Sequence, residues 1–238
     1  MNIGIIIPAY NGGKKLERCI EAINNLETEH DVVTFTHDNT KDNLGFTKAV
    51  NIGLKNFMDG MTDYCVVLNQ DCYLRPDFID NIVKFMEEHP KCAIAGPKQV
   101  LESDEDMIIH GGCTTAFPEG RHIVGRKSEN HCNKNKQMPW VNGACMVVNM
   151  SLMPYFGLMD EGFFLIGSDS DWCYIARQRN FEVWYVADAE VIHEGDGIST
   201  KGTENKELEF KKYLDIMYFK DKWIEDGCFR ELSMEVFG

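Results

Sequence analysis

The strongest constraint on the fold is a series of short, uninterrupted apolar runs, each of which ends in a polar loop. Residues 3–7 form the first run, and Pro8 ends it. Residues 64–68 form another, which leads directly into residues 69–71. A strand that is buried on both faces is apolar at every position, and this is typical of parallel sheets covered by helices. The chain is therefore predicted to be an α/β protein.

Helical patterns fill the segments between these runs. Apolar residues recur at helical spacing in residues 16–26, in residues 46–54 and in residues 78–86, and a further strand is predicted at residues 32–36. Regular alternation of strand and helix predicts a Rossmann-like domain with a mostly parallel central sheet and helices on both faces. Ligands of such sheets bind beyond the carboxyl ends of the strands.

The second half of the chain has a weaker pattern. Periodicity is lost from about residue 96 to residue 139, which predicts a long loop region with at most a short hairpin. A helix is predicted from Asp171 to about Arg179, strands at 181–186 and 189–193, and a terminal helix at 205–226.

One domain is expected for 238 residues. We expect residues 1–95 to form a nucleotide-binding half, residues 96–200 a catalytic and acceptor-binding half, and residues 201–238 a helical tail.

The charge of the chain limits its partners. It has 24 Lys and Arg against 38 Asp and Glu, a formal net charge of −14, which repels nucleic acid. Nucleotides remain compatible because a bound divalent metal reverses the local sign. There is no stretch of roughly 20 apolar residues and no signal peptide, so we expect a cytoplasmic protein without a transmembrane segment. Contact with a membrane surface stays open, and the sequence does not indicate an oligomeric state.

The nine cysteines are odd in number, scattered and mostly set in apolar runs, which favours reduced thiols over disulfides. His110 and Cys113, with His131 and Cys132 further on, are residue types that bind zinc. Their spacing matches no standard zinc finger, which favours loop residues without a metal.

Two phosphate-binding motifs can be excluded. A P-loop would need Gly at position 8 and Ser or Thr at position 15, where this chain has Pro8 and Lys15. No GxGxxG motif follows the first strand, so a dinucleotide-binding fold is not predicted either.

Carboxylates and one histidine stand where strands end. Asp71 follows an apolar strand, where its side chain could bind a hard cation, although by itself this position favours a turn or cap residue. Of Asp169 and Asp171, one could cap the following helix and the other act as a general base. His193 closes an apolar strand, a suitable position for a metal ligand or for a structural histidine.

Seven motifs occur together in the order seen in glycosyltransferase family 2, and their pattern is most similar to its rhamnosyltransferase-like branch. They are residues 7–11, 43–53, 68–71 with Pro76, 140–144, 159–164, 168–171 and 191–193. The tail at residues 217–223 also resembles the usual ending of that branch.

This resemblance implies a GT-A fold and inverting transfer of a sugar to a hydroxyl acceptor on a glycan or glycoconjugate. The implied donor is a UDP-, dTDP- or GDP-linked sugar. The implied cofactor is a divalent metal, Mn²⁺ or Mg²⁺, that bridges the donor diphosphate.

The resemblance also implies roles for individual residues. Asp169 matches the catalytic base, and Asp71 and His193 match the metal ligands. The implied donor-binding residues are Pro8, Tyr10, Asn11, either Asp38 or Asp42, Gly45, Lys48, Asn51, Asn69, Gln70, Gly143 and Ala144. Trp140 and Asp171 are the implied acceptor-binding residues.

The chain departs from the family pattern in three places. Ser168 stands where the family usually has Glu, the metal motif keeps a single carboxylate in residues 69–71, and the segment before Asn43 is short. The first two departures support an alternative, a non-catalytic sugar-nucleotide or glycan-binding module with the same fold. Asp169 together with His193 favours the enzyme. A nucleotidyltransferase would need an Arg-containing loop after the first strand, and residues 9–13 contain no Arg.

Overall fold

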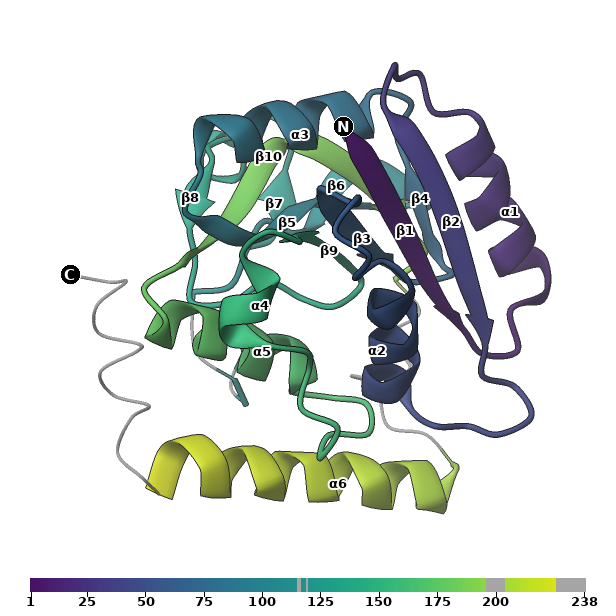
Figure 1. Cartoon of the computed structure of the whole chain (residues 1–238), viewed down its shortest axis with the longest axis vertical. Coiled ribbons are helices and arrows are strands. Elements are labelled where there is room, and N and C mark those ends of the chain that lie inside the picture. Colours follow the sequence, from purple (N-terminus) through teal and green to yellow (C-terminus); the bar gives the residue numbers. More distant parts are fainter. Residues whose placement is uncertain (115–116, 119, 196–203, 226–238) are drawn as a thin grey trace.

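The computed structural model describes residues 1–114, 117–118, 120–195 and 204–225 (Figure 1). The strands are β1 (Asn2–Ala9), β2 (Asp31–Asp38), β3 (Tyr64–Leu68), β4 (Cys72–Leu74), β5 (Cys92–Leu101), β6 (Asp104–His110), β7 (Gly125–Arg126), β8 (Lys136–Gln137), β9 (Cys145–Asn149) and β10 (Glu182–His193). The helices are α1 (Gly13–Asn24), α2 (Phe46–Asn56), α3 (Phe78–Glu88), α4 (Met153–Phe156), α5 (Ser168–Gln178) and α6 (Lys206–Lys220). A 3-10 turn at Asn130–Cys132 and a π-helical turn at Asp221–Glu225 complete the elements.

The strands form one sheet in the order β2-β1-β3-β9-β5-β10-β4. β1 is parallel to β2 and β3, and β10 is parallel to β5. β9 is antiparallel to both β3 and β5, so these two also point the same way, and β4 is antiparallel to β10. The prediction of an α/β fold is therefore confirmed. Five of the seven strands in this order point the same way, and β9 and β4 run opposite to them, so the sheet is mixed. The division into two halves and a tail stays a prediction.

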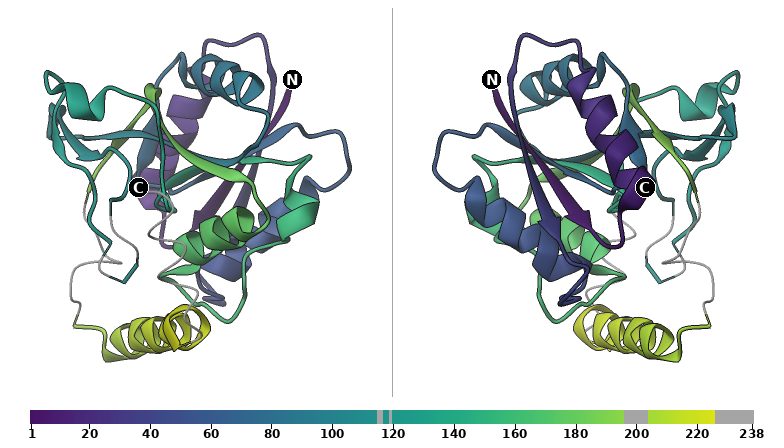
Figure 2. Two further views of the ribbon diagram at one scale, coloured as in Figure 1. Left: turned by 90° about the vertical axis from the view of Figure 1, so that its left-hand side faces the viewer. Right: turned by 90° about the vertical axis from the view of Figure 1, so that its right-hand side faces the viewer.

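Helices cover both faces of the sheet (Figure 2). In β1, Ile5 and Ile7 pack with α1 and α3, whereas Ile6 packs with α2 on the other face. All three side chains are fully buried. Neighbouring residues of a strand point to opposite faces, so a strand covered on both sides needs apolar residues at every position.

The expected loop region at residues 96–139 was partly wrong, because β5 continues to Leu101 and β6, β7 and β8 follow it. Lys98 and Gln99 interrupt the apolar pattern of β5, yet both are buried. The two strands expected at residues 181–193 are one strand, β10, with an irregularity between Val186 and Glu190. Helix α5 begins at Ser168, before Asp171.

The predicted reduced state of the cysteines agrees with the structure. Cys19, Cys65, Cys72, Cys92, Cys113, Cys132, Cys145 and Cys173 are buried and free. Cys228 lies outside the described residues. Among the helices that the structure describes, none is long and apolar enough to cross a bilayer.

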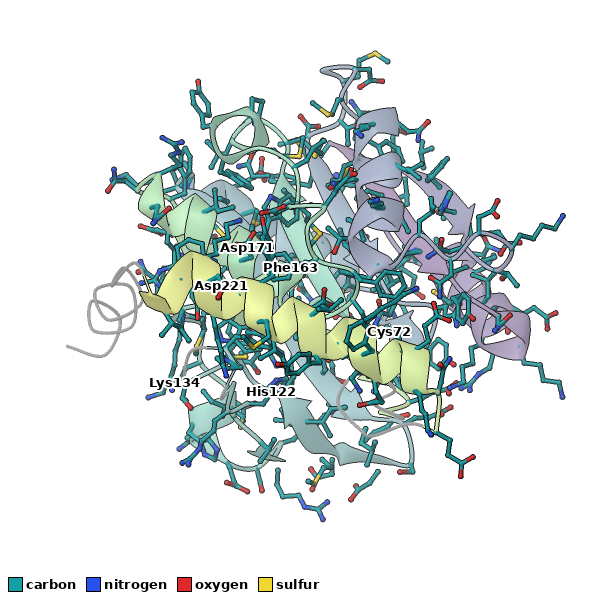
Figure 3. All side chains as sticks on the ribbon, turned by 90° about the horizontal axis from the view of Figure 1, so that it is seen from below. Cys72, His122, Lys134, Phe163, Asp171 and Asp221 are labelled. Carbon is teal, nitrogen blue, oxygen red and sulfur yellow. The ribbon has the colours of Figure 1, made fainter. Side chains whose placement is uncertain are left out.

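The C-terminal helix α6 crosses one face of the molecule (Figures 1 and 3). Trp223, in the π-helical turn after α6, donates its Nε1–H to Asp171 Oδ1 at 2.7 Å, and Lys222 Nζ lies 2.8 Å from the same oxygen. The buried Asp215 accepts backbone N–H bonds from residues 164–166, at 2.7 to 2.9 Å. The tail therefore holds both α5 and the loop before it.

Replacing Trp223, which is 3% exposed, with Ala should destabilise the protein by about 3–5 kcal/mol, because a large cavity opens and Asp171 loses a donor. The control is Phe210→Ala on α6, where the side chain is 60% exposed and the change should stay within about 0.5 kcal/mol. Urea unfolding of both variants measures the difference. Equal effects would contradict the docking of the tail.

Candidate functional site

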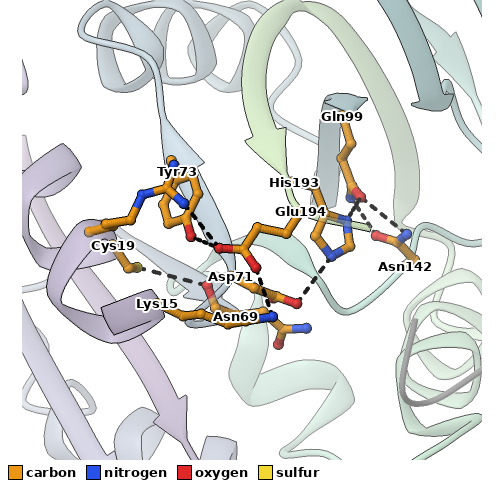
Figure 4. Close-up of polar contacts among 10 residues, drawn as sticks. Lys15, Cys19, Asn69, Asp71, Tyr73, Gln99, Asn142, His193 and Glu194 are labelled. Carbon is orange, nitrogen blue, oxygen red and sulfur yellow. Dashed lines mark hydrogen bonds and ion pairs between the residues drawn. The ribbon is translucent and has the colours of Figure 1, made fainter. Parts of the chain in front are cut away.

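The predicted metal ligands meet at the carboxyl end of the parallel strands. Asp71 lies in the turn after β3, and His193 is the last residue of β10. Antiparallel pairing of β10 with β4 places His193 opposite Cys72, the neighbour of Asp71. As a result, Asp71 Oδ2 and His193 Nε2 are 3.7 Å apart (Figure 4).

A second layer of contacts orients the His193 ring. Its Nδ1 is 3.1 Å from Oε1 of Gln99, a fully buried residue of β5. Gln99 Nε2 in turn donates to Asn142 Oδ1 at 2.5 Å (Figure 4). In the tautomer whose Nδ1–H donates to this amide oxygen, Nε2 has its lone pair free for a metal. His193 is thus set up to use Nε2 as a ligand, in the direction of Asp71.

The charges around Asp71 favour its ionised form. Burial by itself would raise the pKa of Asp71, but the contact with His193 and the positive charge of Lys15 outweigh it, and the pKa is lowered. Lys15 Nζ is 2.7 Å from Glu194 Oε2, and Arg18 also pairs with Glu194. A carboxylate and an imidazole that face each other, with both side chains mostly buried, are residue types that can bind a divalent cation.

Asp169, in the first turn of α5, is held by two backbone amides. Gly143 N–H donates to its Oδ2 and Ser170 N–H to its Oδ1, each at 2.8 Å. Burial raises the pKa of Asp169 although these hydrogen bonds oppose the shift. A carboxylate with a raised pKa accepts protons more readily, which suits a general base.

One short segment connects the predicted base to the predicted metal ligands. Ala144 O accepts the N–H of Asn69, two residues before Asp71, at 2.8 Å, and the preceding Gly143 contacts Asp169. A Cβ atom at Gly143 would lie 3.0 Å from the Phe46 ring, so a larger residue would fit here only if that ring moved by a few tenths of an ångström.

Ser168, which replaces the usual Glu, takes no part in holding the base. Its side chain is buried, and its hydroxyl forms no hydrogen bond within the described chain. The position of Asp169 therefore does not depend on the departure from the family pattern at residue 168.

The predicted nucleoside-binding loops lie beside each other. Tyr10 and Gln70 exchange two hydrogen bonds between the backbone of one and the amide of the other, at 2.9 and 2.8 Å. Asn11 N–H donates to Thr40 Oγ1, which joins the loop after β1 to the loop after β2. The buried Asn39 stiffens that second loop through its own side chain. The predicted donor-binding residues with exposed side chains are Tyr10, Asn11, Asp38, Asp42 and Lys48.

The remaining predicted donor residues are less exposed. Pro8 lies near the end of β1, partly buried, and Gly45 is buried before α2. Gly45 has φ +85°, and a Cβ there would lie 2.3 Å from the Phe164 carbonyl oxygen, so glycine is required for backbone packing.

Three predicted site residues have structural roles instead. Asn51 is 1% exposed, and its amide forms hydrogen bonds with both backbone groups of Met159, so it cannot reach a donor. The Asp171 carboxylate is fully buried against the C-terminal tail and is not open to an acceptor. Trp140 is 4% exposed, and its ring packs against the edges of Phe117 and His122.

Several residues that shape the site were missed from the sequence. They are Lys15, Arg18, Asn39, Gln99, Asn142, Glu194 and Asp215. Glu194 directly follows a predicted ligand, and Asn39 and Asn142 adjoin the predicted residues Asp38 and Gly143. Asn39 acts within its own loop, whereas Gln99, Asn142 and Asp215 act through partners distant in sequence. A cavity of about 280 Å³ lined by Met1, Tyr64 and Asn149 lies away from all of these residues.

The sequence is similar to proteins of known activity. It is 24% identical over 230 residues to the N-acetylglucosaminyl-diphospho-decaprenol L-rhamnosyltransferase of Mycobacterium tuberculosis, with 79% of this chain and 75% of that protein covered. It is 22% identical over 151 residues to the dTDP-rhamnosyl transferase RfbF of Shigella flexneri, with 63% and 49% covered. Both relatives agree with the predicted likeness to the rhamnosyltransferase-like branch.

Solved structures share the fold. GalNAc-T7, crystallised with UDP, GalNAc and Mn²⁺, aligns with a TM-score of 0.61 at 13% identity over 95% of this chain, which spans 57% of that chain. The mannosyltransferase PcManGT from Pyrobaculum calidifontis, in complex with GDP-Man and Mn²⁺, aligns with a TM-score of 0.62 at 12% identity, over 99% of this chain and 69% of that chain. These alignments confirm the GT-A fold.

The family model described as "Glycosyltransferase like family 2" matches residues 27–213, a span from just after α1 into α6. On this match, with the relatives and the fold in agreement, the chain belongs to glycosyltransferase family 2.

Proposed function

We propose that this glycosyltransferase moves a sugar from a nucleoside-diphosphate donor to a hydroxyl group of a glycan or glycoconjugate, with inversion and with a divalent metal. The observation that carries the proposal is the connected arrangement of three side chains. Asp71 and His193 face each other, and Asp169 is joined to their loop through Gly143 and Ala144.

The proposed donor site combines an exposed aromatic ring with a charged recess. Tyr10 is 45% exposed at the end of β1, where its ring can stack on a base, and Asp38 or Asp42 can contact the nucleoside. Lys15 adds positive charge near Asp71, and both Lys15 and Arg18 pair with Glu194. A divalent cation bound by Asp71 and His193 would neutralise the charge that develops on the leaving diphosphate.

The relatives suggest the donor class. RfbF and the mycobacterial protein are named as rhamnosyltransferases, and RfbF is named for a dTDP-linked donor. PcManGT was crystallised with GDP-Man and GalNAc-T7 with UDP. We therefore propose a hexosyl or deoxyhexosyl donor, linked to UDP, dTDP or GDP.

In the proposed reaction, Asp169 removes the proton from the acceptor hydroxyl as its oxygen attacks the anomeric carbon. Attack from the face opposite the diphosphate inverts that carbon. The amides of Gly143 and Ser170 hold the carboxylate in one orientation, so that little rearrangement is needed during proton transfer.

The alternative of a non-catalytic binding module is not favoured. Two sequence features supported it, namely Ser168 in place of Glu and the single carboxylate in residues 69–71. Asp169 is held without help from residue 168, and the similar proteins are named as transferases.

Asp169→Asn should lower transfer by about 10²–10⁴-fold while donor affinity stays near that of the wild type, since the change removes the base and keeps the shape. The control Ser168→Ala removes a hydroxyl without a described partner and should keep most activity. Radiolabelled sugar transfer measures the rate, and calorimetry measures nucleoside-diphosphate binding. Wild-type turnover in Asp169→Asn would show that another group is the base.

Asp71→Ala should weaken nucleoside-diphosphate binding in Mn²⁺, because the metal loses its only carboxylate in residues 69–71. EDTA should weaken wild-type binding to the same extent. Asp188→Ala, an exposed carboxylate on the same strand as His193, is the control and should bind normally. Calorimetric affinity that does not respond to EDTA would refute the metal assignment.

Gln99→Leu should weaken Mn²⁺ binding by about 10–100-fold, because His193 loses the acceptor that sets its tautomer. Gln99→Glu keeps an acceptor oxygen and should restore most of the affinity. Titration of Mn²⁺ in the presence of a nucleoside diphosphate measures both variants. Equal Mn²⁺ affinities of the Gln99→Leu and Gln99→Glu variants would mean that Gln99 does not orient His193.

A further inference from the structure

We propose that His110, Cys113 and His122 form a second metal site, which suits a borderline cation such as Zn²⁺. His110 ends β6, and Cys113 follows it closely. The chain then returns so that His122 forms an isolated antiparallel β-bridge with Cys113. One potential ligand atom from each residue lies within 4.8 Å of the other two.

The two imidazoles are already at nearly the separation that one ion requires. Nδ1 of His110 and Nδ1 of His122 are 3.0 Å apart. Two nitrogens bound to a tetrahedral Zn²⁺ at their usual bond lengths are separated by about 3.3 Å. Small rotations of the rings are therefore enough to place an ion between them, with Cys113 Sγ as the third ligand.

The cluster is deeply buried at His110. His110 is 1% exposed, and its Nε2 has no hydrogen-bond partner among the described residues. The contact with His122 is made by the other nitrogen, Nδ1, so the ion proposed between the two Nδ1 atoms would not be bound by Nε2. The proposal is therefore carried by the spacing of the three potential ligand atoms.

The chemistry of the three side chains favours a different cation from that at Asp71. Burial lowers the pKa of His110 and of His122, so both rings are in the neutral form that binds metals. Burial also raises the pKa of the Cys113 thiol, and a bound ion would displace its proton. Two imidazoles and a thiolate select Zn²⁺ over Mn²⁺ or Mg²⁺, which prefer oxygen ligands.

The residues that meet in the structure differ from the His and Cys residues that the sequence suggested as zinc ligands. His131 Nε2 lies by the carbonyl oxygen of Val124, and Cys132 packs with Val100 and Ile108 in a separate small cluster. His122 replaces both of them because of the β-bridge, a contact that the spacing of residues along the chain does not reveal.

The position of this second site gives it a structural role. The His122 ring packs edge-on against Trp140, and the negative charge of Asp169 acts on Cys113. An ion bound here would join His110 and Cys113 to His122, close to the part of the protein that carries the proposed base. The site is separate from the reaction, so its test does not require transfer activity.

The test is a titration of the full chain, freed of metal and kept reduced without thiols, with Co²⁺ as a spectroscopic substitute for Zn²⁺. We expect a thiolate-to-cobalt charge-transfer band that one equivalent of Zn²⁺ abolishes. The band should be lost in Cys113→Ser and in His122→Gln. It should persist in Cys72→Ser, the control, because Cys72 lies beside Asp71 and His193.

Circular dichroism of each variant shows whether it folds. His122 is partly exposed, so His122→Gln keeps the test informative if Cys113→Ser does not fold. The proposal is overturned if the wild type shows no thiolate band, if the band survives in folded Cys113→Ser or His122→Gln, or if it disappears in folded Cys72→Ser.

Discussion

The register of β10 is the constraint on which the site depends. His193 pairs with Cys72 of β4 on one side and with Leu101 of β5 on the other, and this brings its ring to Asp71. A slip of one residue would turn His193 to the opposite face of the sheet. The register of β10 with β5 shifts between Val186 and Glu190, before the strand reaches His193. Two proposed metal ligands that are distant in sequence are therefore brought together by backbone hydrogen bonds of the sheet.

Four aspartates show how the surroundings assign different roles to one residue type. At Asp71, burial is outweighed by His193 and Lys15, and the pKa is lowered, as a metal ligand requires. At Asp169, burial dominates, and the pKa is raised, as suits a base. Asp171 is buried against Lys222 and Trp223, and Asp215 accepts three backbone amides. The last two support the structure that carries Asp169.

The C-terminal tail lies outside the sheet, but it contacts the helix that carries Asp169 and the loop before that helix. Asp215 binds the amides of residues 164–166, which lead into α5, and Trp223 binds Asp171 within α5. Buried hydrogen bonds to charged groups are costly to break, because the partner is left without compensation. Movement of the tail would therefore disturb the start of α5, where Gly143 and Ser170 hold Asp169.

The sequence by itself determined the first half of the fold, because residues 3–7 and 64–68 and the helices after them carry their own periodicity. It also indicated Asp71, Asp169 and His193, since each stands at the end of a strand or the start of a helix. Only the tertiary structure showed which polar side chains are buried and which partners they contact. Gln99 is a buried polar residue whose role comes from His193 and Asn142, and Asp171 is directed to Trp223 rather than to an acceptor. His122 joins His110 and Cys113 only through a β-bridge. The partners of Gln99 and Asp171 lie far along the chain, and those of His122 are found by strand pairing rather than by sequence spacing. Burial of a polar group is decided by such partners rather than by its neighbours in sequence.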